Sequence, residues 1–174
     1  MKLIRPMACA LIALLGTAAH AQDWPARTVR IVVPFAAGSS PDILARVINE
    51  KLATRLGQAV IVENKPGAGG NSGTDQVAKS TPDGYTFLLS VNAPLVYNTV
   101  LYKRLPYDPF RDLTPVTLAA TTPNVCAVSN SMGVDSVKGW LEALKRNPGQ
   151  YNFASTGSGS IAHLGVELIK LRPQ

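Results

Sequence analysis

Short apolar runs alternate with longer amphipathic stretches along the first half of the chain. The runs Val29–Pro34, Ala59–Val62 and Tyr85–Val91 are rich in β-branched residues and predict three strands, the first of them buried on both faces. Helices are expected from Pro41 to Leu56 and, in a shorter form, around Thr74–Lys79. This order predicts an α/β protein with a parallel sheet and right-handed crossovers.

The first predicted helix has start and stop signals that agree with one another. Ser40 can cap it, Pro41 suits its first position, Asp42 favours its positive end, and Gly57 ends it after Leu56. Its apolar residues fall on one face, which we expect to lie on the sheet. They are Ile43, Leu44, Val47, Ile48, Leu52 and Leu56.

The second half of the chain has weaker strand signals and clearer helix signals. Residues 92–112 are rich in Pro, Tyr and Asn and predict an ordered surface excursion. Extended segments are expected at 113–120, 124–128 and 151–154. Two further helices are expected, one over Val137–Arg146 capped by Ser136 and one from Ile161 to about Leu171.

A break at Thr121–Pro123 divides these elements into two predicted lobes. The first lobe is expected to cover residues 22–120, and residues 121–174 would begin a second lobe. About 50 residues bury too little surface to form a good core unaided, so this second lobe is expected to be incomplete.

The first 21 residues have the pattern of a secretory signal peptide. Lys2 and Arg5 precede the apolar stretch Met7–Leu15, and Ala19-His20-Ala21 has the small-x-small form that predicts cleavage after Ala21. A membrane anchor is the competing interpretation, but the apolar stretch is only about half of the roughly 20 residues that a bilayer needs. The pattern therefore predicts export, with no stable membrane insertion after cleavage.

Composition and charge exclude several functional classes. Hydrophobic residues make up 46% of the chain and charged residues 16%, which disfavours a largely disordered regulator. The net charge is +6, but no basic run is present, so a dedicated nucleic-acid binder is disfavoured. Cys126 stands in an apolar run with no His or second Cys nearby. It is expected to be a small buried residue, and neither a metal site nor another cofactor is expected.

Two stretches share one design, in which a buried strand leads through a turn rich in Gly and Ser into a helix. They are Val33–Asp42 and Phe153–Ser160, which contain the loops Phe35–Asp42 and Ser155–Ser160. Free N–H groups at a helix start attract an anion, so one such loop on each lobe could hold a carboxylate between them. In the alternative interpretation, Ser40 and Ser160 only cap helices and the glycines only permit tight turns.

Asp42 needs a separate interpretation, because a carboxylate in an anion site would repel the ligand. It could orient loop N–H groups, accept from a ligand amine or hydroxyl, or serve only as a favourable charge at a helix start. His163 lies three residues into the last predicted helix, close enough to point at the loop, although a packed or solvent-facing role is the alternative. Tyr107 is expected to be a packing residue.

Enzyme motifs are incomplete in this sequence. Gly157–Ala162 fits the dinucleotide pattern G-x-G-x-x-A, but the acidic residue expected about 20 positions later would fall beyond Gln174. The glycine-rich stretch Gly67–Ser72 lacks the third glycine of that pattern, and no nucleophile elbow G-x-S-x-G is present. The sequence favours no enzyme, and a nucleotide-binding enzyme fragment is the least favoured alternative.

Several phrases of the chain occur together, in the same order, in one family. They are Val32 to Phe35 with Gly38, Asp42 to Arg46, Val62 to Asn71, Pro82 to Thr86, Leu105 to Pro109, and Ala154-Ser155 through Leu164. From about Trp24 to Lys170 the chain resembles the Bug family, the periplasmic solute receptors of tripartite tricarboxylate transporters. The resemblance implies a two-lobed, type II periplasmic binding protein fold that captures a small organic acid and hands it to a membrane permease.

The resemblance also implies which residues contact the ligand. The second lobe would contribute His163, and Asn92, after the third strand, is a further candidate. The other expected contacts come from the two loops and are Phe35, Ala37, Gly38, Ser39, Ser40 and Asp42 in the first and Ser155, Thr156, Gly157 and Ser158 in the second.

The sequence departs from the family pattern in two respects. Ser39 stands where members usually have a glycine, and Pro41 lacks an N–H that another residue would offer, so solute preference is expected to differ. Family members are also longer than this chain. It is therefore expected to be a truncated receptor, and a fragment without ligand function is the alternative.

Overall fold

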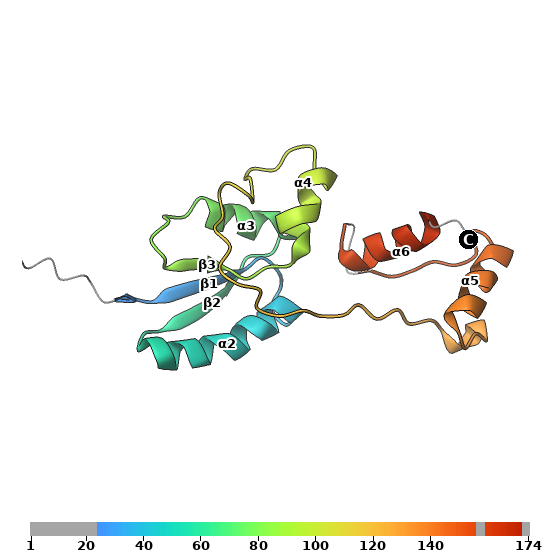
Figure 1. Cartoon of the computed structure of the whole chain (residues 1–174), viewed down its shortest axis with the longest axis horizontal. Helices are drawn as coiled ribbons and strands as arrows, with labels where there is room; N and C mark the ends of the chain where they lie inside the picture. Colours follow the sequence, from blue (N-terminus) through green and yellow to red (C-terminus); the bar gives the residue numbers. More distant parts are fainter. Residues whose placement is uncertain (1–23, 156–158, 172–174) are drawn as a thin grey trace, which may run out of the picture.

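A three-stranded parallel sheet lies at the centre of the first part of the molecule (Figure 1). The computed structural model describes residues 24–155 and 159–171, so the predicted signal segment lies outside the described residues. The strand order is β2-β1-β3, where β1 is Val29–Val33, β2 is Val60–Asn64 and β3 is Thr86–Leu88. The predicted α/β class and parallel sheet are confirmed.

The third strand is shorter than the sequence predicts. The ladder with β1 pairs only Thr86, Phe87 and Leu88, whereas the prediction ran from Tyr85 to Val91. Just before the ladder, the Tyr85 carbonyl oxygen accepts from Arg30 N. Leu89 N still donates to the carbonyl oxygen of Val32, and the chain then leaves the sheet. Because β1 itself ends at Val33, no backbone remains to pair with the residues that follow.

Two helices cover opposite faces of the sheet (Figure 1). Helix α2 spans Ser40–Leu56 and ends at Gly57, as predicted, where the backbone turns left-handed with φ of 64°. Its N-cap is Ser39 rather than the predicted Ser40, and the Ser39 side chain makes no capping bond. Helix α3 spans Asn71–Ala78 and begins three residues earlier than predicted, directly after a turn in which Ala68, Gly69 and Gly70 have positive φ.

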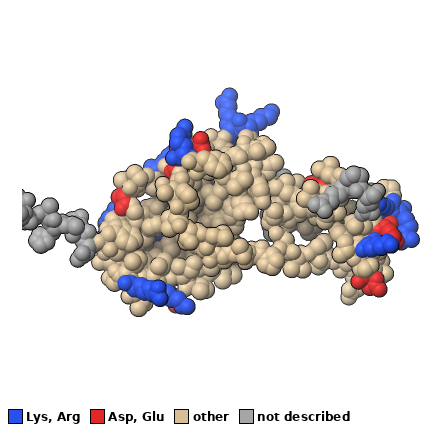
Figure 2. Space-filling view, viewed as in Figure 1, with Lys and Arg blue, Asp and Glu red and all other residues tan. Residues whose placement is uncertain are grey.

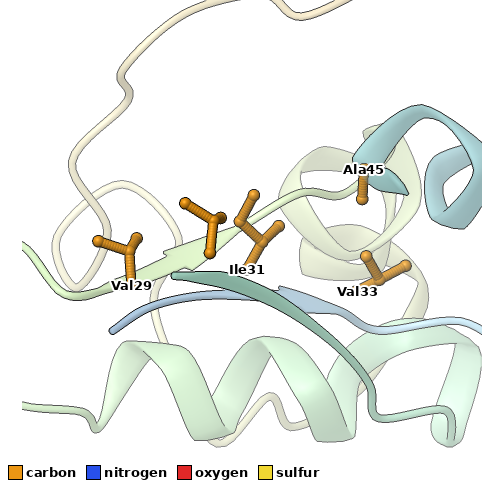
Figure 3. Packing of buried hydrophobic residues seen from close by; sticks show 5 residues of the cluster. Val29, Ile31, Val33 and Ala45 are labelled. Carbon is orange, nitrogen blue, oxygen red and sulfur yellow. The ribbon is translucent and has the colours of Figure 1, made fainter. Parts of the chain in front are cut away.

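The core is built from one face of β1 and from the helix side that meets it. Figure 3 shows Val29, Ile31 and Val33 pointing to one side of the strand, with Ala45 of α2 beside them. Ile43 and Val47, which were expected to face the sheet, are 56% and 58% exposed. The buried positions run instead from Asp42 through Ala45 to the half-buried Leu52 and Leu56, and the hydrogen bonds of Asp42 described below fix this rotation of the helix.

The excursion after β3 contains helical turns that the sequence did not predict. A π-helical turn, Ala93–Tyr97, runs directly into α4, Asn98–Leu101. Tyr107 is buried, as predicted, and its hydroxyl donates to the carbonyl oxygen of Pro94 at 2.7 Å and lies 3.0 Å from Asn71 Oδ1. Burial raises the pKa of Tyr107, so the hydroxyl stays protonated and remains a donor.

The remaining described residues form helices but no strand. Helix α5, Val137–Arg146, has the predicted bounds, and Ser136 caps it by accepting from Gly139 N at 3.2 Å. Helix α6 is Ile161–Leu171, again as predicted. The extended segments expected at 113–120, 124–128 and 151–154 have no ladder partner among the described residues, so they are not strands.

Three further observations concern the free cysteine, metal binding and membrane spans. Cys126 is exposed, so the prediction of a buried residue is wrong; it lies in the segment 114–130, in which every residue is exposed. Among the residues that the structure describes, no three potential ligands gather to hold a metal ion. No helix in those ranges is long and apolar enough to cross a bilayer.

Candidate functional site

The segments that follow β1, β2 and β3 leave the same edge of the sheet, because the three strands are parallel. The connection from β1 runs to β2 on one side, whereas β3, on the other side of β1, is reached from β2 through α3. Open α/β sheets place their ligands where the strand order reverses in this way. The segments also touch. A Cβ built on Gly70 would lie 3.0 Å from Phe35 Cζ and 3.1 Å from Pro94 Cγ. The loop after β1 thus contacts the segments after β2 and β3.

The first predicted loop is built on a tight turn, Ala36–Ser39. Ser39 N donates to the carbonyl oxygen of Ala36 at 3.2 Å, and Gly38 at the third position has φ of 83°. A type II turn requires such a positive φ, which glycine adopts without strain. Nothing lies within 4 Å of a Cβ built on Gly38, so the backbone conformation, and not crowding, explains this glycine.

Asp42 is buried directly behind this turn and accepts hydrogen bonds from three residues. Its Oδ2 accepts from Gly38 N at 2.8 Å and from Arg46 Nε at 3.1 Å, and its Oδ1 accepts from Asn64 Nδ2 at 2.9 Å. The Arg46 hydrogen bonds, then the Gly38 N–H and the Asn64 amide, lower the pKa of Asp42 from 3.8 to about 2. Asp42 is therefore a carboxylate at neutral pH, and it orients the loop.

These contacts change which groups of the first loop are open to a ligand. The Gly38 N–H, which the sequence assigned to an anion, is used by Asp42 in this structure. Within the described ranges, the exposed residues Ala36 and Ala37 have no acceptor for their N–H groups. Ser40 is exposed as well, and the Ser39 hydroxyl is buried without a described partner. Amides and hydroxyls of this kind can bind a carboxylate.

Asn92 lies where β3 gives way to the excursion, at the start of the π-helical turn. It is exposed, and its Nδ2 donates to the Tyr97 hydroxyl at 3.3 Å. The sequence-predicted position after the third strand is thus on the same edge of the sheet as the first loop. Its amide oxygen has no donor among the described residues.

The second predicted loop is described in part. Thr156, Gly157 and Ser158 lie outside the described residues, and Ser155 is exposed. Ser160 Oγ accepts from His163 N at 3.2 Å and so caps α6, as the sequence predicts. The Gly159 N–H donates to His163 Nδ1 at 3.2 Å.

His163 therefore reaches back to the loop, as expected from its place in the helix. Its ring stacks on that of Phe153, with centroids 6.0 Å apart and planes 20° apart. Because Nδ1 accepts from Gly159, the neutral ring carries its proton on Nε2. The side chain thus supports the loop through one nitrogen and keeps a donor on the other.

The second loop packs against α4 of the first part. Gly159 is buried, and a Cβ built on it would lie 2.7 Å from Leu101 Cδ1. Asn98, in the same helix, donates through Nδ2 to Asn71 Oδ1 at 2.6 Å and to the Gly69 carbonyl oxygen at 3.4 Å. A continuous path of contacts thus joins the second loop to the glycine turn after β2. In Figure 2 the middle of the face in view, where the two parts meet, carries no charged side chain.

Two cavities in the described chain lie away from these loops. One, of about 370 Å³, is lined by residues 99–110 beside α4, among them Tyr102 and Phe110. The other, of about 390 Å³, is lined by Arg27, Arg30 and Lys79 among others. No predicted ligand-contact residue lines either cavity, so neither supports the predicted site.

Sequence reasoning missed several residues that shape the site. Arg46 was not among the predicted site residues, yet it pairs with Asp42 one helical turn earlier, a spacing that could have revealed the pair. Asn64, at the carboxyl end of β2, gave no comparable signal, because its partners come from the loop and from α2. The buried amides of Asn71 and Asn98 also depend on contacts between distant segments.

Comparisons with known proteins agree on one family. Residues 44–173 match the description "Tripartite tricarboxylate transporter family receptor". Protein BugT of Bordetella pertussis is 43% identical over 164 residues, which cover 92% of this chain and 50% of BugT. The chain thus spans about half the length of the curated relatives it matches.

Two solved structures from Rhodopseudomonas palustris are similar in fold as well as in sequence. Rpa4515 with adipate has a TM-score of 0.79 at 37% identity, covering 85% of this chain and 50% of that one. MatC with bound malate has a TM-score of 0.68 at 30% identity, covering 86% and 52%. The shared fold in both cases is that of a periplasmic binding protein.

Proposed function

The chain belongs to the tripartite tricarboxylate transporter receptor family, and we propose that it carries ligand-recognising loops of a periplasmic receptor for a small organic acid. The ligand class is a di- or tricarboxylate or a related acid. The predicted signal segment directs export, and the receptor hands its ligand to the membrane permease of the transporter. No chemical step on the ligand is part of this function.

The arrangement of the two loops is the observation that carries the proposal. Each loop leads into a helix of more than two turns, α2 or α6, and the second loop packs on α4 through Gly159. A carboxylate held near both helix starts would accept from backbone N–H groups and hydroxyls, with the helix dipoles adding attraction. The adipate and malate bound to similar proteins support a carboxylate as the ligand.

Within the loops, the proposal assigns contacts to specific groups. The first loop would offer the Ala36 and Ala37 amides and the exposed Ser40 hydroxyl, with Phe35 at its base. The Ser39 hydroxyl, which is buried, would reach the ligand only after a change of rotamer. The second loop would offer Ser155 and the positions after it, with His163 Nε2 as a further donor. Asn92 would add an amide from the segment after β3. Asp42 would act through the first loop and not on the ligand.

Calorimetry on a chimera tests this function. Residues 24–171 would replace the matched half of full-length BugT, and adipate, malate and citrate would be titrated into the chimera and into BugT. We expect saturable 1:1 binding of at least one acid to the chimera. If the chimera folds, as judged by a cooperative melt, and binds none of the three, the proposal is wrong for this chain.

A pair of matched variants separates ligand contact from helix capping. Ser136 and Ser160 cap α5 and α6 with the same geometry, each accepting an N–H at 3.2 Å from the residue three positions on. Ser136→Ala and Ser160→Ala should lower stability to a similar extent. Only Ser160→Ala should weaken acid binding, because only that cap lies in a proposed ligand loop. Equal affinities would favour the capping interpretation of the second loop.

The alternative that the chain is part of a nucleotide-binding enzyme can be tested directly. The notable feature is the G-x-G-x-x-A stretch at Gly157–Ala162, part of which lies outside the described residues. A fluorescence titration of the 174-residue chain with NADH should show no saturable binding. Saturable binding would favour a nucleotide-dependent function over carboxylate reception.

A further inference from the structure

We infer that Asp42, Arg46 and Asn64 form a clamp that positions the turn Ala36–Ser39 and keeps the first loop compatible with an anionic ligand. The three side chains are called the turn clamp below. The positioning half of this inference, that the clamp holds the turn in place, concerns the free protein. The recognition half, that the clamp keeps the loop compatible with an anionic ligand, rests on the proposed function. Arg46 and Asn64 would thereby join the residues that determine recognition without touching the ligand.

The geometry of the turn clamp fixes both ends of the turn. Asn64 Nδ2 donates to the carbonyl oxygen of Phe35 at 3.1 Å, just before the turn, and to Asp42 Oδ1 at 2.9 Å. Asp42 Oδ2 accepts from Gly38 N at 2.8 Å, inside the turn. The backbone on either side of Ala36 and Ala37 is therefore tied to the same two side chains, while the N–H groups between them have no described acceptor.

Arg46 closes the turn clamp from the helix side. Its Nε donates to Asp42 Oδ2 and its Nη2 donates to Asn64 Oδ1, both at 3.1 Å. The same Nη2 lies 3.1 Å from Asp42 Oδ1, so the contact with the carboxylate is two-pronged. Each member of the clamp is thus bonded to the other two, and Arg46 holds the Asp42 carboxylate and the Asn64 amide in their orientations toward the loop.

The members of the turn clamp come from rigid elements. Asp42 and Arg46 occupy successive turns of α2, and Asn64 is the last residue of β2, opposite Val33 of β1. A loop held by such elements has its binding conformation before the ligand arrives, which reduces the ordering entropy that binding would otherwise cost. The clamp is therefore a means of preorganising an otherwise exposed turn.

The charges of the turn clamp cancel beside the helix start. Asp42 alone would place a buried negative charge at the end of α2 where an anion is expected to bind. Arg46 is the charged side chain in contact with it among the described residues, since the contacts from the loop and β2 are the neutral Gly38 and Asn64. Without Arg46, the carboxylate would oppose a carboxylate ligand across a short distance.

NMR on the 174-residue chain tests the positioning half directly. The Gly38 amide resonance should shift with pH as Asp42 titrates, with a midpoint near 2, and Arg46→Gln should move that midpoint upward. Asp42→Asn should speed hydrogen exchange at Gly38 about tenfold or more, because a bond to a charged acceptor is lost. Asn64→Ala should speed it to a lesser extent, since Asn64 acts on Gly38 through Asp42.

Asp75→Asn is the matched control, because Asp75 and Lys79 form an ion pair of the same i,i+4 spacing, at 2.6 Å, on α3. It should leave Gly38 unchanged. If Gly38 exchanges at the same rate in the unaltered chain, Asp42→Asn and Asn64→Ala, the turn does not depend on the clamp and the inference is wrong.

Affinity for adipate and malate in the BugT chimera tests the recognition half. Arg46→Gln should weaken binding about tenfold, Arg46→Lys should weaken it less because the charge remains, and adding Asp42→Asn to Arg46→Gln should restore part of the affinity. A gain of affinity from the second substitution would show that Arg46→Gln acts through charge, since a purely structural defect would weaken binding further when a second residue is changed. Melting temperatures measured in parallel identify variants that fail to fold.

The outcomes separate the two proposals. If the unaltered chimera binds neither acid, the proposed function fails while the Gly38 measurements still decide the positioning half. If the chimera binds and all variants bind equally, the recognition half of the inference is overturned and the proposed function stands.

Discussion

In the first region, residues 24–112, a sheet is buried between two helices. In the second region, residues 113–171, two helices are joined to a largely exposed chain. Among the described residues, the buried hydrophobic side chains from Val29 to Tyr107 all belong to the first region, and the second region adds only Ala143. Helix α6 has no buried residue, and its Leu168 and Leu171 are 54% and 77% exposed. The two regions therefore differ in packing far more than in their content of helix.

This difference shows which elements can form without a core. An α-helix satisfies its backbone within its own segment, and capping residues such as Ser136 and Ser160 complete its ends. A strand needs a neighbour for every hydrogen bond. The second region accordingly keeps its helices and has no strand among the described residues, while the first region has both.

The largest expected effect comes from cutting into the core of the first region. Ile31→Ala removes a side chain that is 5% exposed, so it should lower the free energy of unfolding by about 2–5 kcal/mol. Ile161→Ala, at a position that is 45% exposed, should change it by no more than about 0.5 kcal/mol. Urea denaturation followed by circular dichroism measures both. Equal losses would mean that the two regions share one core.

A glycine from each region gives effects of opposite sign. A Cβ on Gly73 in α3 would lie 2.7 Å from the Lys65 carbonyl oxygen and 2.8 Å from Pro34 Cβ, so Gly73→Ala should destabilise by about 3 kcal/mol. A Cβ on Gly165 in α6 would meet nothing within 4 Å, and Gly165→Ala should stabilise that helix by about 0.5–1 kcal/mol. Thermal melts at 222 nm would show the two shifts, and a destabilising Gly165→Ala would contradict the open surroundings of α6.

Two tyrosines sharpen the comparison inside the first region. Tyr107→Phe leaves the buried Pro94 carbonyl without its 2.7 Å donor and should cost about 2 kcal/mol. Tyr102→Phe removes an exposed hydroxyl that reaches the Ala68 carbonyl at 3.3 Å, and it should be nearly neutral because water replaces the bond. Guanidinium titrations of both variants measure the difference. A neutral Tyr107→Phe would show that the excursion is not part of the cooperative unit.

The smallest effect distinguishes a helix start that has a side-chain cap from one that does not. Ser136 accepts from Gly139 N, so Ser136→Ala should weaken α5 by about 1 kcal/mol. Ser39 makes no capping bond to α2 and its hydroxyl is buried without a described partner, so Ser39→Ala should leave stability unchanged or raise it slightly. Amide exchange in the first turn of each helix is the appropriate readout. Faster exchange in α2 after Ser39→Ala would reveal a role that the hydrogen-bond geometry does not show.

The sequence was sufficient for features whose causes are local. The bounds of α5 and α6, the end of α2 at Gly57 and the apolar β1 follow from caps, breakers and short-range pattern. The strand expected at 151–154 also has a clear short-range pattern, but a strand forms only with a neighbouring strand, and no short-range pattern specifies that neighbour. The helical turns at 93–101 were missed because the asparagines around them disfavour a helix locally, whereas burial of Asn98 and Tyr107 favours it in the fold.

The candidate site was predictable in position and only partly in detail. The loop after β1 and the cap of α6 could be located from Gly and Ser next to predicted element ends. Asp42 accepts from the Gly38 amide within its own loop and helix start, whereas its bond from Asn64 depends on the approach of α2 to the end of β2. Asn64 lies 18, 22 and 29 residues from its partners Arg46, Asp42 and Phe35, beyond the reach of spacing rules.

The connecting segment between the regions has a consequence for behaviour in concentrated solution. Residues 113–128 contain no charged residue, and Val116, Leu118 and Val125 are 74%, 78% and 87% exposed on a backbone without ladder partners. A segment with unpaired backbone N–H and C=O groups, β-branched side chains and no charge is a template onto which a second copy of the chain can add strands. Native proteins usually protect such edges with charged side chains. A Lys introduced at Val125 would act as a gatekeeper against self-association while leaving the sheet of the first region untouched.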